Sequence, residues 1–175
     1  MTADDSAEAD AIAASVASGT DGIAVPAELV EEQPTPAPAS LLHRIQSMTV
    51  AERIKLALRG NREARMHLVR DPNSLIRRFV LQNPRIGDEE LLALAKNRSA
   101  DQELLRIIAD SREWSKNYQI RHALVTNPKT PTALALRFVG SLSDRDMRAL
   151  AKSKNVPTAV AAAAKRIVLM KGEQR

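Results

Sequence analysis

Few side chains in this sequence could carry out acid–base, nucleophilic or metal chemistry. Its three histidines, His43, His67 and His122, are far apart in the chain, so no two of them form a ligand pair on one helix. The absence of cysteine removes thiol nucleophiles, thiolate metal sites and disulfides together. The acidic run at 88–90 opens an expected helix, where the helix dipole favours carboxylates without any metal. We therefore expect a protein that is not an enzyme and that holds no cofactor or metal.

Three similar stretches of nine residues each carry an arginine in the second position. They are ARMHLVRDP at 64–72, IRRFVLQNP at 76–84 and IRHALVTNP at 120–128. In a structural role, the guanidinium groups of Arg65, Arg77 and Arg121 would bond carbonyls or an Asp or Asn side chain at an adjacent helix end. In a recognition role, they would form a row of cations along one face. We favour the structural role, because a repeated position reflects stacking more often than recognition.

A basic segment with two interleaved aromatic residues lies further along the chain. Trp114 and Tyr118 stand among Arg112, Lys116 and Arg121 in the stretch SREWSKNYQIRH. Such a segment is suited to stacking on bases or clamping a peptide, and the alternative is that both rings fill a joint between helical units. The candidate residues for contact with a partner are Arg77, Arg112, Trp114, Lys116, Tyr118 and Arg121.

The elements that would position these residues are helices. The chain is 44% apolar but only 2% aromatic, and a core of Leu, Ile, Val and Ala suits packed helices better than a β-sandwich. From residue 41 the apolar residues recur with helical spacing, and an Asp or Asn before a proline ends several helices. The pattern predicts helices near 49–59, 62–70, 74–82, 88–97, 101–111, 116–126, 131–140, 144–153 and 157–171.

The stretches at 76–84 and 120–128 are 44 residues apart, and the sequences after them can also be aligned. In each stretch the first, fourth and fifth residues are apolar and would bury one stripe of a helix. A period of this length is typical of stacked helical units that cannot bury their apolar faces alone. We therefore expect an all-α fold, a short right-handed α-solenoid with repeats of about 44 residues. The stretch at 64–72 would be a degenerate N-terminal capping unit.

These stretches and the sequel NPKTPTALALRFV resemble bacterial α-solenoids of the HEAT and armadillo superfamily. The resemblance is strongest to leucine-rich-repeat-variant proteins, with their short Val-Arg and Asn-Pro helices, and it covers about residues 62–156. It implies a solenoid fold and does not specify a function. The cysteine cluster of some variant-repeat proteins is absent here, so no iron–sulfur or metal role is implied.

Charge is divided unevenly along the chain. Residues 1–42 hold eight acids and no Lys or Arg, whereas residues 43–175 hold all 26 basic residues against 13 acids. Pro34, Pro36 and Pro38 favour an extended linker, so we expect residues 1–42 to be a disordered acidic tail and residues 43–175 to be the folded domain. Within the tail, ADAIAASVA and AELVEE have the composition of pieces that become ordered on a partner.

The sequence also bears on location. The N-terminus is acidic and lacks the features of a signal peptide, and no stretch approaches 18 uninterrupted apolar residues. We expect a cytoplasmic protein without membrane insertion.

The charge division favours a binding protein. Our leading expectation is a non-enzymatic interaction or scaffold module whose basic surface binds an acidic peptide or partner protein, with its acidic tail as a regulator. The alternative is nucleic-acid binding, supported by the net charge of +13 over residues 43–175 and by a fold-level similarity to helical-repeat alkylpurine DNA glycosylases. The bases are spread over every helix and no aromatic-lined base pocket is evident, so we favour the protein partner.

Overall fold

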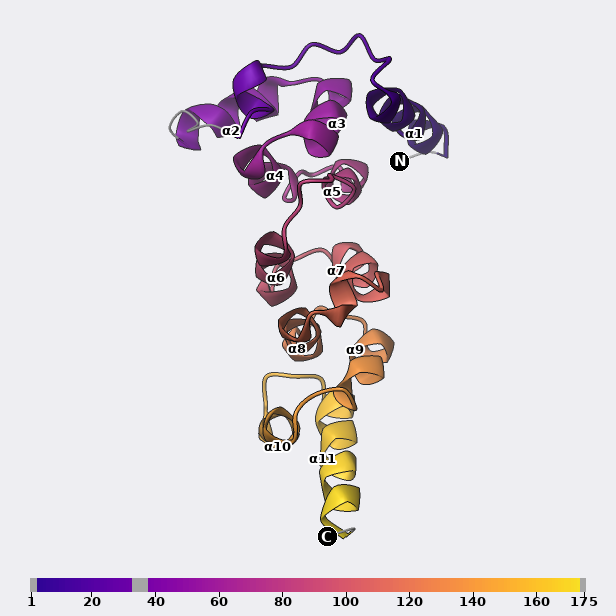
Figure 1. Cartoon of the computed structure of the whole chain (residues 1–175), viewed down its shortest axis with the longest axis vertical. Coiled ribbons are helices and arrows are strands. Elements are labelled where there is room, and N and C mark those ends of the chain that lie inside the picture. Colours follow the sequence, from indigo (N-terminus) through magenta and orange to yellow (C-terminus); the bar gives the residue numbers. More distant parts are fainter. Residues whose placement is uncertain (1–2, 33–37, 174–175) are drawn as a thin grey trace. The chain divides into compact units, whose positions relative to one another are not determined.

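A computed structural model describes residues 3–32 and 38–173, and every regular element in them is a helix (Figure 1). The α-helices are α1 (Ala3–Ser18), α2 (Pro38–Ser47), α3 (Val50–Arg59), α4 (Arg62–Leu68), α5 (Ser74–Val80), α6 (Asp88–Lys96), α7 (Gln102–Asp110), α8 (Tyr118–Thr126), α9 (Thr132–Val139), α10 (Asp144–Lys152) and α11 (Thr158–Glu173). Two short 3-10 helices are η1 (Ala27–Leu29) and η2 (Trp114–Lys116). The predicted all-α fold is confirmed for these residues. None of their helices combines the length and apolarity needed to span a membrane.

Helices α3 to α11 lie in the nine stretches predicted from the sequence, and their ends differ from the prediction by no more than two residues. Side-chain caps explain several of these ends. At the start of α3, the Thr49 hydroxyl accepts the Glu52 N–H at 3.3 Å, and the Glu52 carboxylate accepts the Thr49 N–H at 2.7 Å. This reciprocal pair satisfies two backbone donors that the helix itself leaves free.

The N-terminal segment differs from its prediction. Residues 1–42 were expected to be disordered, but they contain α1 and η1, and α2 begins at Pro38. Helix α1 packs against α3 and buries Ala9, Ala13 and Val16, which are spaced as i, i+4 and i+7. The buried face is made mostly of alanine, so it adds little to the hydrophobicity of the segment. Pro38 stands at the first helical position, where the missing N–H of proline costs nothing. Pro34 and Pro36 lie outside the described residues.

The chain divides into two compact units, residues 1–86 and 87–175. In the first unit, α3 packs against α1, α4 and α5, and α2 packs against α4. In the second unit, α6 packs against α7 and α8, while α11 packs against α9 and α10. The boundary predicted at residue 42 therefore falls inside the first unit.

The predicted apolar stripes lie in the cores of the two units. The buried residues are Ile76, Phe79 and Val80 in α5, and Ile120, Ala123 and Leu124 in α8. In the earlier stretch, His67 takes the position of Phe79 and is only half-buried, while Leu68 next to it is buried. The burial of the stripe is thus confirmed in both stretches, and in the earlier stretch Ala64 and Leu68 are buried while His67 interrupts the stripe.

A buried asparagine, Asn83 or Asn127, comes near the end of each of these two stretches. Each side-chain amide donates to two carbonyls at the C-terminal end of an earlier helix, α3 for Asn83 and α6 for Asn127. The N···O distances are 2.9 Å to Ala57, 3.2 Å to Gly60, 2.8 Å to Ala95 and 2.9 Å to Asn97. Because the last carbonyls of a helix have no donor within the helix, each asparagine ties one helix end to the loop after a later helix.

The earlier stretch has Asp71 at this position, and its bonds differ accordingly. A carboxylate has no N–H to donate, so it cannot bond to helix carbonyls. Asp71 instead accepts from Arg53 Nη1 of α3 at 2.7 Å, and its other oxygen accepts the Asn73 N–H at 2.8 Å. The residue at this position thus still contacts α3, but through an ion pair with Arg53 in place of hydrogen bonds from a neutral amide.

The burial of Leu29 gives a direct test of the N-terminal packing. Leu29→Ala should lower the free energy of unfolding by about 2 to 5 kcal/mol, because the side chain is fully buried in the core of the first unit. Urea unfolding followed by circular dichroism measures the change. Leu169→Ala, at a position that is 58% exposed, is the matched control and should change little. Equal values for the two variants would contradict the packing of the segment against the first unit.

Asn127→Asp tests the buried amide. The carboxylate would face the carbonyls of Ala95 and Asn97 without an N–H between them, so we expect a loss of about 3 kcal/mol in unfolding free energy at neutral pH. The same substitution at the exposed Asn155 is the control and should be nearly neutral. A small effect at Asn127, measured by the same urea titration, would show that the two bonds contribute little.

Candidate functional site

Cationic side chains of α2 to α5 pair with carboxylates of the N-terminal segment, which we define as residues 3–32. The ion pairs are Arg78–Asp10 at 2.7 Å, Lys55–Asp21 at 2.6 Å, Arg65–Glu32 at 3.4 Å and Arg44–Glu28. The hydrogen bond from Lys55 lowers the pKa of Asp21 below its ordinary value. The acidic segment thus lies against basic side chains contributed by four different helices.

Residues just before α4 and after α5 also bond to the backbone of the segment. Asn61 and Arg85 donate to four successive carbonyls in residues 28–31, around the fully buried Leu29. The bonds are Asn61 N to Leu29 O at 2.8 Å, Asn61 Nδ2 to Glu28 O and Glu31 O, both at 3.0 Å, and Arg85 Nη1 to Val30 O at 2.7 Å. Binding to main-chain carbonyls around one buried apolar side chain is the way in which proteins hold a linear peptide.

The C-terminal end of α1 is held in a similar way. Arg59 Nη2 donates to the carbonyls of Val16 and Ala17, both at 3.1 Å. A cation is favourable at this end of a helix, because the last carbonyls are unpaired and the helix dipole is negative there. Arg59 therefore fixes the position at which the chain leaves α1.

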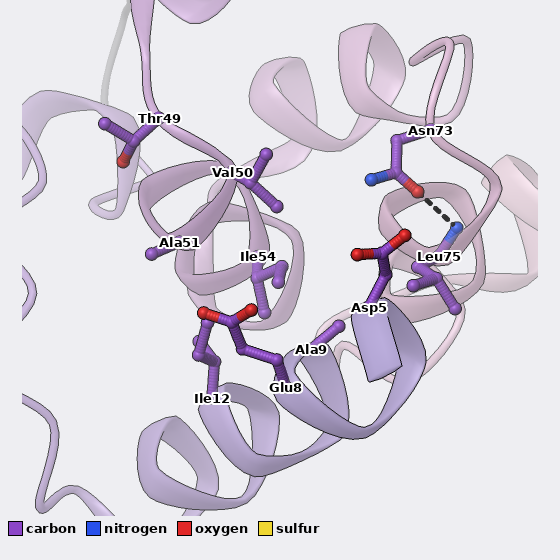
Figure 2. Close-up of a pocket in the computed structure, with 10 residues that line it drawn as sticks. All are labelled: Asp5, Glu8, Ala9, Ile12, Thr49, Val50, Ala51, Ile54, Asn73 and Leu75. Atoms are coloured by element: carbon purple, nitrogen blue, oxygen red, sulfur yellow. Dashed lines mark hydrogen bonds between the residues drawn. The ribbon is translucent and has the colours of Figure 1, made fainter. Parts of the chain in front are cut away.

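A pocket of about 440 Å³ remains between α1 and α3, with the start of α5 on one side. Figure 2 shows that Asp5 and Glu8 extend from α1 toward this gap, and the lining also includes the apolar side chains of Ile54 and Leu75. The pocket reflects the small side chains with which α1 meets α3. Two carboxylates on one wall do not define a ligand site, and we assign none to it.

The arginines at the repeated position bond to backbone carbonyls just before their own helix. Arg77 Nη1 donates to Asp71 O at 2.6 Å and Pro72 O at 3.0 Å, and Arg121 Nη1 donates to Ser115 O at 2.8 Å and Lys116 O at 2.7 Å. Arg65 Nη1 donates to Gly60 O at 2.9 Å. These bonds to backbone carbonyls are of the kind expected for the structural role, and Arg65 also pairs with Glu32 of the N-terminal segment. A recognition role for Arg77 and Arg121 stays a prediction.

The aromatic residues predicted for partner contact lie in the second unit, at η2 and the start of α8. The Tyr118 hydroxyl donates to the carboxylate of Asp146 in α10 and accepts the Ser143 N–H at 3.1 Å. The guanidinium of Arg121 lies 5.6 Å from the centre of the Tyr118 ring. Trp114 is half-buried. Tyr118 therefore links α8 to the start of α10, in keeping with a joint between helices.

The other two predicted contact residues, Arg112 and Lys116, are exposed on either side of Trp114. Their side chains face solvent. Arg77 belongs to the first unit, whereas the remaining five candidate residues belong to the second. Trp114, Tyr118 and Arg121 thus lie together where η2 meets the start of α8. A partner-binding role for the six candidate residues stays a prediction.

The two units differ in net charge once the N-terminal segment is counted with the first. Residues 1–86 contain 10 basic and 11 acidic residues, whereas residues 87–175 contain 16 basic and 10 acidic residues. When charge is counted by unit instead of by tail and body, the first unit is nearly neutral and the second unit has a net charge of +6. The excess positive charge that could attract a partner lies in the second unit.

The sequence analysis did not predict the residues that hold the N-terminal segment. Arg59, Asn61 and Arg85 carry no motif, because their partners lie between 30 and 55 residues earlier in the chain. One available signal was the i, i+4, i+7 spacing of Ala9, Ala13 and Val16, which indicates a helix with a buried face.

Comparison with known proteins identifies no relatives. No protein-family model, curated protein or solved structure matches the chain. Within residues 3–32 and 38–173, no group of three or more His, Cys, Asp or Glu side chains is placed to hold a metal ion. The function must therefore be inferred from the surfaces described above.

Tyr118→Phe tests the link between α8 and α10. Hydrogen bonds from Tyr118 and then Ser143 hold the pKa of Asp146 below its ordinary value of 3.8. A lowered pKa stabilises the fold at pH values above 3.8, and this contribution is lost as the pH falls through the folded-state pKa. In the variant, carboxyl NMR titration should show the pKa of Asp146 rising toward 3.8, with reduced stability at neutral pH but not at pH values below the folded-state pKa. An unchanged pKa would contradict the link.

Proposed function

We propose that this chain is a non-enzymatic helical-repeat module that binds an acidic peptide or partner protein through basic side chains. Its own acidic N-terminal segment occupies one such surface, on α2 to α5 of the first unit. The segment thereby acts as an internal ligand that limits the binding of external acidic partners. A module of this kind would act as a scaffold for the partners that it binds.

The observation that carries the proposal is the double recognition of residues 21–32. Lys55, Arg65 and Arg44 pair with carboxylates of the segment. Asn61 and Arg85 bond to its carbonyls while Leu29 is fully buried. Carboxylates, main-chain carbonyls and one apolar anchor together are the features of an acidic peptide. A surface that holds such a peptide within one chain has the chemistry to hold a similar one from another protein.

The repeat architecture is supported by local structure that recurs. Asn83 and Asn127 make equivalent bonds to the ends of α3 and α6. The groups α3–α4–α5 and α6–α7–α8 show the same pattern of packing, each with its first helix against its third. Both features fit an α-solenoid with repeats of about 44 residues, as the resemblance to HEAT and armadillo-like proteins implies. Solenoids of this kind expose extended surfaces that bind peptides and proteins.

Nucleic-acid binding remains the alternative, and the contacts separate the two. The phosphate oxygens of a nucleic acid would accept hydrogen bonds from the same donors, but a nucleic acid has no aliphatic side chain to take the buried place of Leu29. Stacking of bases calls for a free ring face, and the guanidinium of Arg121 already lies over the Tyr118 ring, 5.6 Å from its centre. We therefore favour the peptide, and an oligonucleotide serves as the comparison ligand below.

Neutralising the internal ligand tests the proposal without removing its apolar anchor. The variant Asp10→Asn, Asp21→Asn, Glu28→Gln and Glu32→Gln keeps Leu29 but removes the four ion pairs. We expect it to bind a fluorescent peptide that copies residues 19–32 several-fold more tightly than the wild type in low salt. The gain should disappear at about 0.5 M salt, where the screening length is only a few Å. Fluorescence anisotropy measures both affinities.

A second variant controls for net charge. Glu63→Gln, Glu89→Gln, Glu103→Gln and Glu113→Gln removes the same number of charges from exposed positions outside the N-terminal segment. The proposal fails if the two variants bind the peptide equally. If the first variant binds a single-stranded oligonucleotide of equal charge more tightly than it binds the peptide, the nucleic-acid alternative is favoured.

A further inference from the structure

Helices α10 and α11 pack side by side in the second unit (Figure 1). A groove of about 380 Å³ lies between them. Its walls are one stripe from each helix, with residues spaced as i, i+3 and i+4. The lining residues are Arg148, Ala151 and Lys152 from α10, and Lys165, Val168 and Leu169 from α11.

The charged residues of the groove are all cations. Arg148, Lys152 and Lys165 are exposed, and among the residues whose side chains the structure describes no carboxylate lines the groove. The two nearby acids at the start of α10 are engaged elsewhere: Asp144 pairs with Lys171 at 2.8 Å, and Asp146 accepts from Tyr118. The three cations therefore concentrate the positive charge of the second unit beside one groove, which attracts anionic groups.

The floor of the groove is apolar. Val168 is half-buried, and Leu169 is 58% exposed although it is a large aliphatic side chain. Cations flanking exposed aliphatic side chains suit a ligand that carries both carboxylates and apolar side chains. The groove has no aromatic residue on which a base could stack, so it suits a nucleic acid less well.

We propose that the groove between α10 and α11 is a docking site for an acidic peptide segment that carries aliphatic side chains. This chemistry matches that of residues 21–32, which the first unit holds with basic side chains around Leu29. The inference rests on the proposed binding of acidic partners, but it assigns a separate surface in the second unit, whereas the N-terminal segment is held by residues of the first unit. An external partner could therefore bind here while the first unit holds its internal ligand.

The test uses the full-length chain and the fluorescent peptide that copies residues 19–32. Arg148→Glu with Lys165→Glu reverses two charges in the groove, and Arg98→Glu with Lys129→Glu reverses two exposed charges outside it in the same unit. We expect the groove variant to bind the peptide about tenfold more weakly than the wild type in low salt, and the control variant at most about twofold more weakly. Circular dichroism verifies that both variants keep their helices.

The apolar floor has its own readout. Leu169→Ala should weaken binding of the peptide about threefold, but it should leave binding of a polyglutamate peptide of equal charge unchanged, because polyglutamate has no aliphatic side chain to bury. Equal affinities of the groove and control variants would overturn the site, and so would an absence of peptide binding by the wild type. A single-stranded oligonucleotide that binds more tightly than the peptide, and is lost in the groove variant, would also overturn it. The gain from neutralising the N-terminal acids is measured separately, so failure of the groove does not decide the proposed function.

Discussion

The carbonyls at the C-terminal end of an α-helix must find donors outside the helix, and in this protein buried asparagines supply them. Asn83 and Asn127 each donate two bonds to the end of an earlier helix while they accept a backbone N–H from the loop that follows. The amide is suited to this position because it has donors and an acceptor but no charge to desolvate. The helices are short, so the position of each depends on such bonds as well as on its apolar stripe.

The first unit uses similar bonds to hold the N-terminal segment. Asn61 bonds to carbonyls of residues 28–31 much as Asn83 bonds to the end of α3, so the short helix η1 takes the place that a helix end takes elsewhere. The segment is therefore both part of the core, through Leu29, and a neutralising layer over basic side chains. These two roles are separable, because the apolar anchor and the carboxylates belong to different residues. The second unit has no equivalent layer within the described residues.

The sequence predicted those parts of the fold that have local signals. The stripe of Ile76, Phe79 and Val80, followed by Asn83 and a proline, shows both the helix and its end within nine residues. The signal for helix α1 was weaker, because its buried face is mostly alanine, and its ion pair with Arg78 spans 68 residues. For the site, the residue types around Trp114 and Tyr118 were recognisable. The partner of Tyr118 lies 28 residues later, so only the structure could connect it with Asp146.

The proline after each buried asparagine has a chemical consequence for the lifetime of the protein. Asparagine side chains deamidate when the backbone nitrogen of the next residue attacks the amide, and the product is an acid. Pro84 and Pro128 have no N–H, so this route is blocked at Asn83 and Asn127. An acid there could not donate to the carbonyls of α3 or α6. The residue that ends the helix thus also protects the amide on which the packing relies from slow chemical ageing.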